Sequence, residues 1–321
     1  MSSQWNEGTR LVADIGGTNS RLALYDASRD EYRALRTYIN RDHARFEDVI
    51  ANWLDQLNEP PPLAACFAIA APLEGDRVHM INMDWSFSRS ELTSRFNFTT
   101  SGWINDFEGN AYALPHLREN DRQLLYPGRP GTSRRLAVVG PGTGLGGATV
   151  ELIRGGYHAT ACEPGHMSLS PNTAEELELF RLLLARHDNI FTELLVSGPG
   201  LQRLYQSLAE LRDTAPEALS PADISQRALS GEDPLCRDAL VHFCNLLGST
   251  CGDFVLATGS YGGLFLAGGI LPRLVGFLEN SQFLARFQHK GAMTEHLQGV
   301  PIYLITTAQP GLIGAAHAPL G

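Results

Sequence analysis

Two glycine-rich segments of the chain have the composition of phosphate-binding turns. The first, Gly16–Asn19, follows closely after Asp14, and the second runs from Gly140 to Gly147. Glycine exposes backbone N–H groups and lets an anion approach closely, and Thr18 and Thr143 add hydroxyl donors. A carboxylate beside such a turn repels phosphate unless a cation lies between them. We therefore predict a polyphosphate site in which Asp14 holds Mg²⁺ through water, because Mg²⁺ retains several waters in proteins.

Two other phosphate-binding patterns fit the chain less well. Gly142–Gly147 matches G-x-G-x-x-G, but the dinucleotide fingerprint requires a following helix. Ala148–Leu152 instead alternates and contains β-branched residues, which indicates a strand and disfavours a dehydrogenase. A P-loop needs Gly-Lys-Ser/Thr, whereas the only lysine, Lys290, lies between His289 and Gly291. Phosphate must then be held by backbone N–H groups, hydroxyls, arginine or metal; the alternative is that both segments are purely structural hairpin turns.

The elements around the two turns repeat. Leu11–Ile15 and Arg21–Tyr25 flank the first turn and predict a β-hairpin, in whose turn we expect glycines with positive φ. Leu136–Val139 and Ala148–Leu152 flank the second turn in the same way. The repeat suggests a duplicated lobe, one in each half of the chain.

Hydrophobic spacing predicts the other elements. The expected order is a helix over 46–57, a strand over 63–71 buried on both faces, a helix capped by Ser88, a strand ending at Asn105, a mostly helical region after residue 170, strands over 264–267 and 301–305, and a last helix starting at Pro310. Cys236, Cys244 and Cys251 are expected to pack in the core.

Composition restricts the class of protein. The length of 321 residues suits two lobes, and a net charge of −10 disfavours nucleic acid as a partner. The start, Met1–Arg10, is polar, and no apolar run reaches the length of a membrane span. Because the five cysteines include no Cys-x-x-Cys, we expect reduced thiols in a cytoplasmic protein that is not bound to a membrane. Disulfides in a secreted protein are the weaker alternative.

Longer motifs carry a resemblance to a known family. Asp14–Arg21 resembles the first phosphate motif of the hexokinase–actin–Hsp70 superfamily, Gly140–Gly146 its second, and Leu266–Gly269 its adenosine motif. Finer features resemble the bacterial glucokinase family, and they occur in the same order over nearly the whole chain: Ile104–Phe107, Glu163–His166, Glu193 before Ser197–Leu201, and Pro310–Gly314.

The resemblance implies an α/β, two-lobed actin-like ATPase fold of the ribonuclease H-like type, with duplicated βββαβα-type lobes. Residues 1–115 and 308–321 would form a small lobe and 116–307 a large lobe, with sugar and ATP in the cleft between them. It also implies an ATP-dependent kinase that phosphorylates D-glucose at the 6-hydroxyl, uses Mg²⁺ and forms a homodimer.

The family motifs also assign residues. Asp106 would be the catalytic base, and the sugar would contact Asn105, Asp106, Glu163, His166 and Glu193. The nucleotide would contact Asp14, Gly16, Gly17, Thr18, Asn19, Gly142, Thr143, Gly144, Gly268 and Gly269. By themselves, Asn105 has the alternative role of a helix cap, and Glu193 that of a surface helix residue.

The sequence departs from related families at two places, and two rival functions stay open. Repressor-type sugar kinases carry a cysteine-rich zinc site after Glu-x-Gly-His, whereas Met167–Asn172 has no cysteine, so His166 is expected to bind sugar and not zinc. Pro164 stands where glycine is common. The rivals are a kinase for fructose, mannose or an N-acetylated sugar, and a non-catalytic sugar-sensing regulator. Such regulators usually add an N-terminal helix-turn-helix, for which a first strand beginning at Leu11 leaves no room.

Overall fold

The computed structural model describes residues 8–81, 83–129, 131 and 133–320; most of the polar start noted above therefore lies outside the described residues. The chain divides into two units. The first extends to Arg118 and also contains Leu152–Ala161 and the chain from Thr307 onward, whereas the second contains Glu119–Glu151 and Cys162–Thr306.

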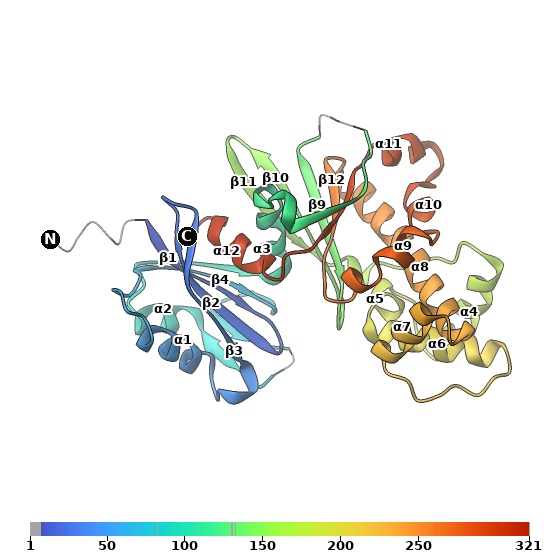
Figure 1. The fold of residues 1–321 in the computed structure, drawn as a ribbon, viewed down its shortest axis with the longest axis horizontal. Coiled ribbons are helices and arrows are strands. Elements are labelled where there is room, and N and C mark those ends of the chain that lie inside the picture. The colour runs from blue at the N-terminus through green and yellow to red at the C-terminus, as the bar shows by residue number, and fades with distance from the viewer. Residues whose placement is uncertain (1–7, 82, 130, 132, 321) are drawn as a thin grey trace. The chain divides into compact units, whose positions relative to one another are not determined.

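The first unit is a five-stranded sheet with helices on both faces (Figure 1). Its strand order is β3-β2-β1-β4-β7, in which β1, β4 and β7 are parallel and β2 is antiparallel to both β1 and β3. The strands are β1 (Thr9–Ile15), β2 (Asn19–Asp26), β3 (Glu31–Ile39), β4 (Ala64–Ile69) and β7 (Thr100–Asn105), and β5 (Arg77–His79) pairs separately with β6 (Ser86–Ser88). The helices are α1 (Phe46–Asp55), α2 (Arg89–Arg95), α3 (Asp106–Ala113) and α12 (Pro310–His317).

Alternating side chains of β1 separate the two faces of this sheet. Leu11, Ala13 and Ile15 pack in a cluster with α1 and α2, whereas Val12 packs in a second cluster with α3 and α12. Both faces of the central strands are thus buried, as the continuous apolar run of β4 predicts. The carboxyl ends of β1, β4 and β7 lie on one edge of the sheet, where α3 begins.

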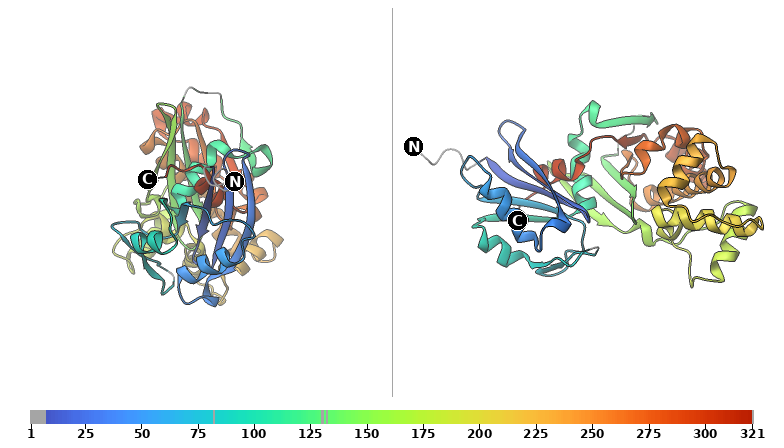
Figure 2. Two further views of the ribbon diagram at one scale, coloured as in Figure 1. Left: turned by 90° about the vertical axis from the view of Figure 1, so that its left-hand side faces the viewer. Right: turned by 60° about the horizontal axis from the view of Figure 1, so that its bottom comes forward.

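The other sheet has six strands in the order β11-β10-β9-β12-β13-β8. Most of it belongs to the second unit, whereas the end of β10 and nearly all of β11 fall in the segment Leu152–Ala161 of the first unit. Its strands are β8 (Arg122–Tyr126), β9 (Arg135–Pro141), β10 (Leu145–Ile153), β11 (Gly156–Cys162), β12 (Gly263–Leu266) and β13 (Ile302–Ile305). Helices α4 (Ala174–Leu184), α5 (Thr192–Leu195), α6 (Gly198–Leu211), α7 (Pro221–Ser230) and α8 (Pro234–Thr258) lie together as a bundle (Figure 2), followed by α9 (Val275–Glu279), α10 (Phe283–Gln288) and α11 (Thr294–Gln298).

The two sheets confirm the predicted duplication. In each, an antiparallel hairpin (β1–β2 or β9–β10) is followed across the sheet by two strands parallel to its first strand (β4 and β7, or β12 and β13). The glycine-rich turn connects the two strands of the hairpin in each sheet. The short similarity between the two sequence segments therefore reflects a repeated strand arrangement.

Helix α8 is the one described helix that is long and apolar enough to cross a membrane, so the expectation that no run reaches that length is wrong. Most of its residues are buried inside the second unit, as in the core helix of a soluble protein, which makes it weak support for a membrane span. Asp233 caps its start by accepting from the N–H groups of Leu235 and Cys236, and Gly259, with φ of 66°, ends it. Cys236, Cys244 and Cys251 are buried in the core, as predicted.

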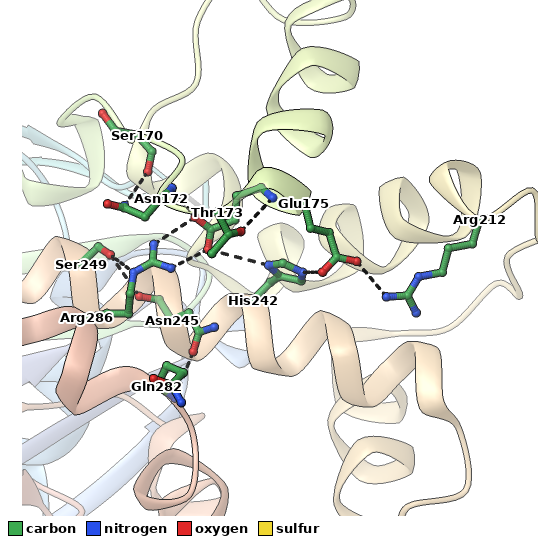
Figure 3. A network of polar contacts seen from close by, with 11 residues as sticks. Ser170, Asn172, Thr173, Glu175, Arg212, His242, Asn245, Ser249, Gln282 and Arg286 are labelled. Carbon is green, nitrogen blue, oxygen red and sulfur yellow. Dashed lines mark hydrogen bonds and ion pairs between the residues drawn. The ribbon is translucent and has the colours of Figure 1, made fainter.

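A buried ion pair connects α4 with α10 (Figure 3). The Glu176 carboxylate is fully buried, and it accepts hydrogen bonds of 2.8 and 3.0 Å from the Arg286 guanidinium and one of 2.6 Å from the Asn172 N–H. Arg286 also donates to Ser249 on α8. The His242 ring lies 3.2 Å from the Glu175 carboxylate beside a hollow of about 260 Å³. This network connects α4, α8 and α10 to one another through hydrogen bonds between protein groups, and we interpret it as a structural feature.

Candidate functional site

The first glycine-rich turn closes the β1–β2 hairpin, and Gly17 and Thr18 are exposed on it. The Gly16 N–H donates to the Asn19 carbonyl at 3.0 Å. The expected positive φ of the glycines in this turn is wrong, because the described glycines that adopt positive φ lie elsewhere, Gly268 among them. A Cβ on Gly16 would make only an ordinary contact, 3.5 Å from the Asn19 carbonyl oxygen.

Asp14 lies at the carboxyl end of β1, beside this turn. Its register partners are Arg21 on β2 and Ala68 on β4, and the Arg21 guanidinium is 3.4 Å from its carboxylate. Burial raises the pKa of Asp14 above its ordinary value, and the charge and hydrogen bond of Arg21 oppose the shift only in part. A buried carboxylate that is costly to charge fits a nearby cation.

The described residues form no cluster of three or more His, Cys, Asp or Glu side chains that could hold a metal ion. A magnesium ion near Asp14 would therefore take most of its ligands from water and phosphate, which is the usual coordination of Mg²⁺ in nucleotide sites. The arrangement thus fits the predicted water-mediated site and does not fit a cage made of protein ligands alone.

Asp106 is the first residue of α3 and follows β7 directly. Burial, together with the nearby negative charge of Asp14, raises the pKa of Asp106 to about 6, while hydrogen bonds from backbone N–H groups and Asn105 oppose the shift. The two carboxylates thus interact at one edge of the sheet. Asp106 is ionised near neutral pH yet able to take up a proton, as a general base requires.

Asn105 caps α3. Its side-chain oxygen accepts from the N–H groups of Phe107 at 2.9 Å and Glu108 at 3.4 Å, and the Glu108 carboxylate accepts from the Asn105 N–H. The helix-cap alternative for Asn105 is therefore correct. The cap uses the side-chain oxygen, and the side-chain nitrogen donates to the Asp106 carboxylate. Because this nitrogen carries two N–H groups, one donor remains for the predicted sugar contact.

Glycines set the distance between α3 and α12. A Cβ on Gly314 would overlap the Gly109 carbonyl, so these two helices cross with almost no space between their backbones. A Cβ on Gly311 would lie 2.7 Å from the Asp14 carboxylate carbon. The Pro310–Gly314 motif thus places the start of α12 directly against Asp14 and α12 itself against the helix that carries Asp106.

In the second unit, Glu193 lies at the start of α5 and is partly buried. Its carboxylate accepts a 2.7 Å hydrogen bond from the N–H of Leu145, the residue that ends the second glycine-rich turn. A Cβ on Gly144 would overlap this carboxylate, and a Cβ on Gly165 would lie 3.2 Å from it. The alternative that Glu193 is a surface helix residue is therefore wrong, because its carboxylate bonds to the turn.

Glu163 directly precedes a 3₁₀ turn, Pro164–His166, whose last residue is His166, and both side chains are exposed. The His166 ring packs 5.6 Å from the ring of Phe191. A Cβ on Gly147 would lie 2.6 Å from the Pro164 ring, so proline fits here only because residue 147 has no side chain. The turn that carries Glu163 and His166 is thus packed on the second hairpin.

Helix α6 starts beside the second turn. The Gly198 N–H donates to the Gly142 carbonyl at 2.8 Å, and Ser197 caps the helix by accepting from the Gly200 N–H. The positive end of the α6 dipole therefore lies next to this turn, where it favours an anion. Gly268, with φ of 99°, approaches the Pro141 carbonyl so closely that a Cβ would lie 2.5 Å from it.

Comparisons with known proteins decide the family. The sequence model of the glucokinase family matches residues 11–320. A glucokinase of Aromatoleum aromaticum is 40% identical over 310 residues, which cover 96% of this chain and 94% of the relative. The chain belongs to the glucokinase family. The crystal structure of a glucokinase from an Antarctic psychrotroph superposes with a TM-score of 0.88 at 37% identity, covering 97% of this chain and 98% of that one.

A more distant structure extends the likeness in fold. It is a ROK family glucokinase from Streptomyces griseus in complex with glucose and AMPPNP, with a TM-score of 0.64, 19% identity and coverage of 96% of this chain and 98% of that one. The predicted two-lobed actin-like ATPase fold with duplicated lobes is confirmed by these structural neighbours and by the repeated sheets.

The predicted site residues form two groups, one in each unit. In the first unit, Asn105 and Asp106 lie at the sheet edge that also carries Asp14 and the turn Gly16–Asn19. In the second unit, Gly142–Gly144, Glu163, His166 and Glu193 surround the second hairpin, and Gly268 packs on Pro141. The roles of these residues toward sugar and nucleotide stay predictions.

Sequence reasoning did not single out Asn40 or Ser197 as site residues, although each bonds to a segment of the site. Ser197 donates to the Glu193 carbonyl at 2.8 Å and caps α6, a role that the Ser-Gly-Pro-Gly segment could have indicated. Asn40 follows an edge strand and has no such signal.

Proposed function

We propose that this chain transfers the γ-phosphoryl group of ATP to the 6-hydroxyl of D-glucose, giving glucose 6-phosphate and ADP. The family membership supports a hexose kinase, and the names of its relatives favour glucose among the hexoses. The observation that carries the proposal is Asp106, a partly buried carboxylate at the start of α3 whose pKa is raised to about 6 and which interacts with Asp14 beside a glycine-rich turn.

In the proposed reaction, the 6-hydroxyl oxygen of the sugar attacks the γ-phosphorus while the bond to the β–γ bridging oxygen breaks and ADP leaves. The proton of the hydroxyl goes to the Asp106 carboxylate. Mg²⁺, when bound, would supply positive charge that offsets the phosphate oxygens. Asp14 would hold that ion through water, and the N–H groups of the two turns would bind the phosphates.

The sugar would be held by groups that match its hydroxyls. Asn105 would donate from its side-chain nitrogen, since its oxygen caps α3. Glu163, His166 and Glu193 would supply acceptors and a donor from the second unit. One Glu193 oxygen accepts from Leu145, so we assign the other, Oε1, to a sugar hydroxyl.

The nucleotide would take its contacts from Gly16, Gly17, Thr18 and Asn19 in the first unit. In the second unit it would contact Gly142, Thr143 and Gly144, together with Gly268 and Gly269 of the adenosine motif. Support comes from the exposure of Gly17, Thr18, Thr143, Gly268 and Gly269 at the ends of their strands.

A coupled assay on a panel of hexoses tests the proposal. The panel contains glucose, fructose, mannose and N-acetylated sugars, each with ATP, ADP or polyphosphate as donor. We expect turnover with glucose and ATP, and turnover at least about 10²-fold slower in the Asp106→Asn variant. Preference for another hexose would replace glucose within the same mechanism. Binding of sugar without turnover would support the sugar-sensing regulator instead.

The remaining expectations rest on the family resemblance. A homodimer predicts a sedimentation mass of twice the 35.0 kDa of one chain, and a mass of one chain would contradict it. A cytoplasmic location predicts that the protein stays in the soluble fraction after membranes are removed.

A further inference from the structure

Asn40 is a buried residue that makes three hydrogen bonds to the first glycine-rich turn and the residue directly after it. It follows β3 directly and is only 2% exposed. Its side-chain nitrogen donates to the Gly16 carbonyl at 2.8 Å, its side-chain oxygen accepts from the Ser20 hydroxyl at 2.8 Å, and its backbone N–H donates to the Thr18 carbonyl at 2.9 Å. Asn40 thus binds the turn at its start and middle and the residue that follows its end.

These bonds determine which groups the turn presents to a ligand. In a trans peptide the C=O and the next N–H point in opposite directions, and no described peptide bond is cis. Because the Gly16 carbonyl points toward the buried Asn40, the Gly17 N–H points away from it. Gly17 and Thr18 are exposed. A phosphate that approaches the Gly16–Gly17 peptide from the side opposite Asn40 therefore meets the Gly17 N–H and not the Gly16 carbonyl oxygen, which would repel it.

The second turn shows the same arrangement with a different donor. Gly142 follows β9 as Gly16 follows β1, and its carbonyl accepts from the Gly198 N–H at 2.8 Å. In each hairpin, a donor from outside the hairpin thus binds the carbonyl of the first turn glycine. The second turn takes this donor from the backbone of α6, whereas the first depends on the Asn40 side chain.

We propose that Asn40 is a positioning residue that holds the first turn in its phosphate-binding conformation and so sets the affinity for the nucleotide. It does so without contacting the nucleotide. The inference rests on the proposed function because that function places ATP at this turn. A purely structural role would instead change stability and leave nucleotide affinity intact.

The test compares Asn40→Ala with Asn52→Ala, a control at an exposed asparagine of α1 in the same unit. Calorimetry measures the Kd of MgADP, and a coupled assay measures the KM values for ATP and glucose. We expect Asn40→Ala to weaken MgADP binding and raise the ATP KM about tenfold, since two hydrogen bonds to the turn are lost. The glucose KM and both constants of the control should stay within about twofold of wild type.

Two further variants separate the bonds and protect against misfolding. Asn40→Asp keeps the acceptor for Ser20 but cannot donate to the Gly16 carbonyl, so we expect an effect at least as large as that of alanine. Ser20→Ala removes only the hydroxyl bond, and we expect a smaller loss of MgADP affinity in the same direction. If Asn40→Ala does not fold, these two variants decide.

Two outcomes would overturn the inference. One is a folded Asn40 variant whose MgADP Kd stays within about twofold of wild type; the other is a wild-type chain that does not bind MgADP. A wild-type chain that binds MgADP but phosphorylates no hexose would contradict only the proposed function, and the calorimetric comparison would still test Asn40.

Discussion

Replacing Asp106 with asparagine separates the chemistry of the site from its shape. Asparagine has nearly the same volume and can still hydrogen-bond a sugar hydroxyl, but it cannot accept the proton. A positioned general base contributes about 10²–10⁴-fold to the rate. We therefore expect kcat to fall at least about 10²-fold, while the glucose Kd, measured by calorimetry, changes far less.

The pH dependence tests the same residue in the wild-type chain. Burial and the charge of Asp14 raise the pKa of Asp106 to about 6. Only the ionised carboxylate can take the proton, so kcat/KM should fall about tenfold for each pH unit below that value. Asp14→Asn removes one cause of the raised pKa, so the point at which activity falls should move to lower pH. The quantity to compare is the pH at which kcat/KM falls, and not the size of kcat/KM. Asp14 is also proposed to hold Mg²⁺, so replacing it lowers the rate itself.

Stability should change in the opposite sense to activity. The folded pKa of Asp106, about 6, lies above the ordinary value for aspartate. The folded chain therefore binds more protons than the unfolded chain between these two pKa values, and its stability falls as pH rises through that window. Asp106→Asn avoids this loss. Above pH 6 we expect it to gain between about 1 and 3 kcal/mol in the free energy of unfolding, the upper limit being two pKa units without solvent screening.

Two results would refute this account of Asp106. Retention of more than about a tenth of the wild-type kcat by Asp106→Asn would show that another group takes the proton, and Glu163 would be the next candidate. An acid limb that does not move in Asp14→Asn would show that the two carboxylates do not interact. Denaturant unfolding at pH 5 and pH 8 supplies the stability comparison.

Three further predictions follow from the contacts. Gly144→Ala should raise the glucose KM about tenfold or more, although residue 144 lies in the nucleotide turn, because its Cβ displaces the Glu193 carboxylate; Gly276→Ala, with open space around it, is the control, and an unchanged glucose KM would contradict the reasoning. Glu176→Ala should cost about 3–5 kcal/mol in denaturant unfolding because it leaves a buried arginine charge unpaired, whereas the exposed pair of Glu178 on the same helix should be worth less than about 1 kcal/mol. Elemental analysis of the purified protein should find no bound zinc, because no cysteine cluster follows the Glu-Pro-Gly-His segment; one tightly bound zinc per chain would contradict this.

Local patterns predicted the features that depend on neighbouring residues. Alternation and glycine content were sufficient to place both hairpins, and the apolar run over 63–71 indicated a strand buried on both faces, which is β4. The prediction that the glycines of the first turn adopt positive φ is wrong. At Gly144, in the second turn, the need for glycine also has another origin. The actual reason at Gly144 is its closeness to the Glu193 carboxylate, 49 residues later in the chain, which no local pattern contains.

Glu193 shows the same limit for a site residue. On its own it is an acidic residue near the start of a short helix, for which a surface position is the ordinary interpretation. Its partial burial arises from Gly144 and Gly165, two residues without side chains that leave space for the carboxylate. Only the family resemblance assigned it to the site from sequence, and only the folded chain supplies a physical reason for the glycines around it.

The duplicated hairpins explain why the two phosphate turns should respond differently to mutation. The carbonyl of the second turn is bound by the backbone N–H of Gly198, which any residue other than proline at that position also possesses. The carbonyl of the first turn is bound by the side chain of Asn40, which a single substitution removes. In the same strand arrangement, one turn is thus held by the backbone of a helix and the other by a single side chain. Nucleotide affinity should therefore be adjustable by mutation behind the first turn without any change in the residues that contact the nucleotide.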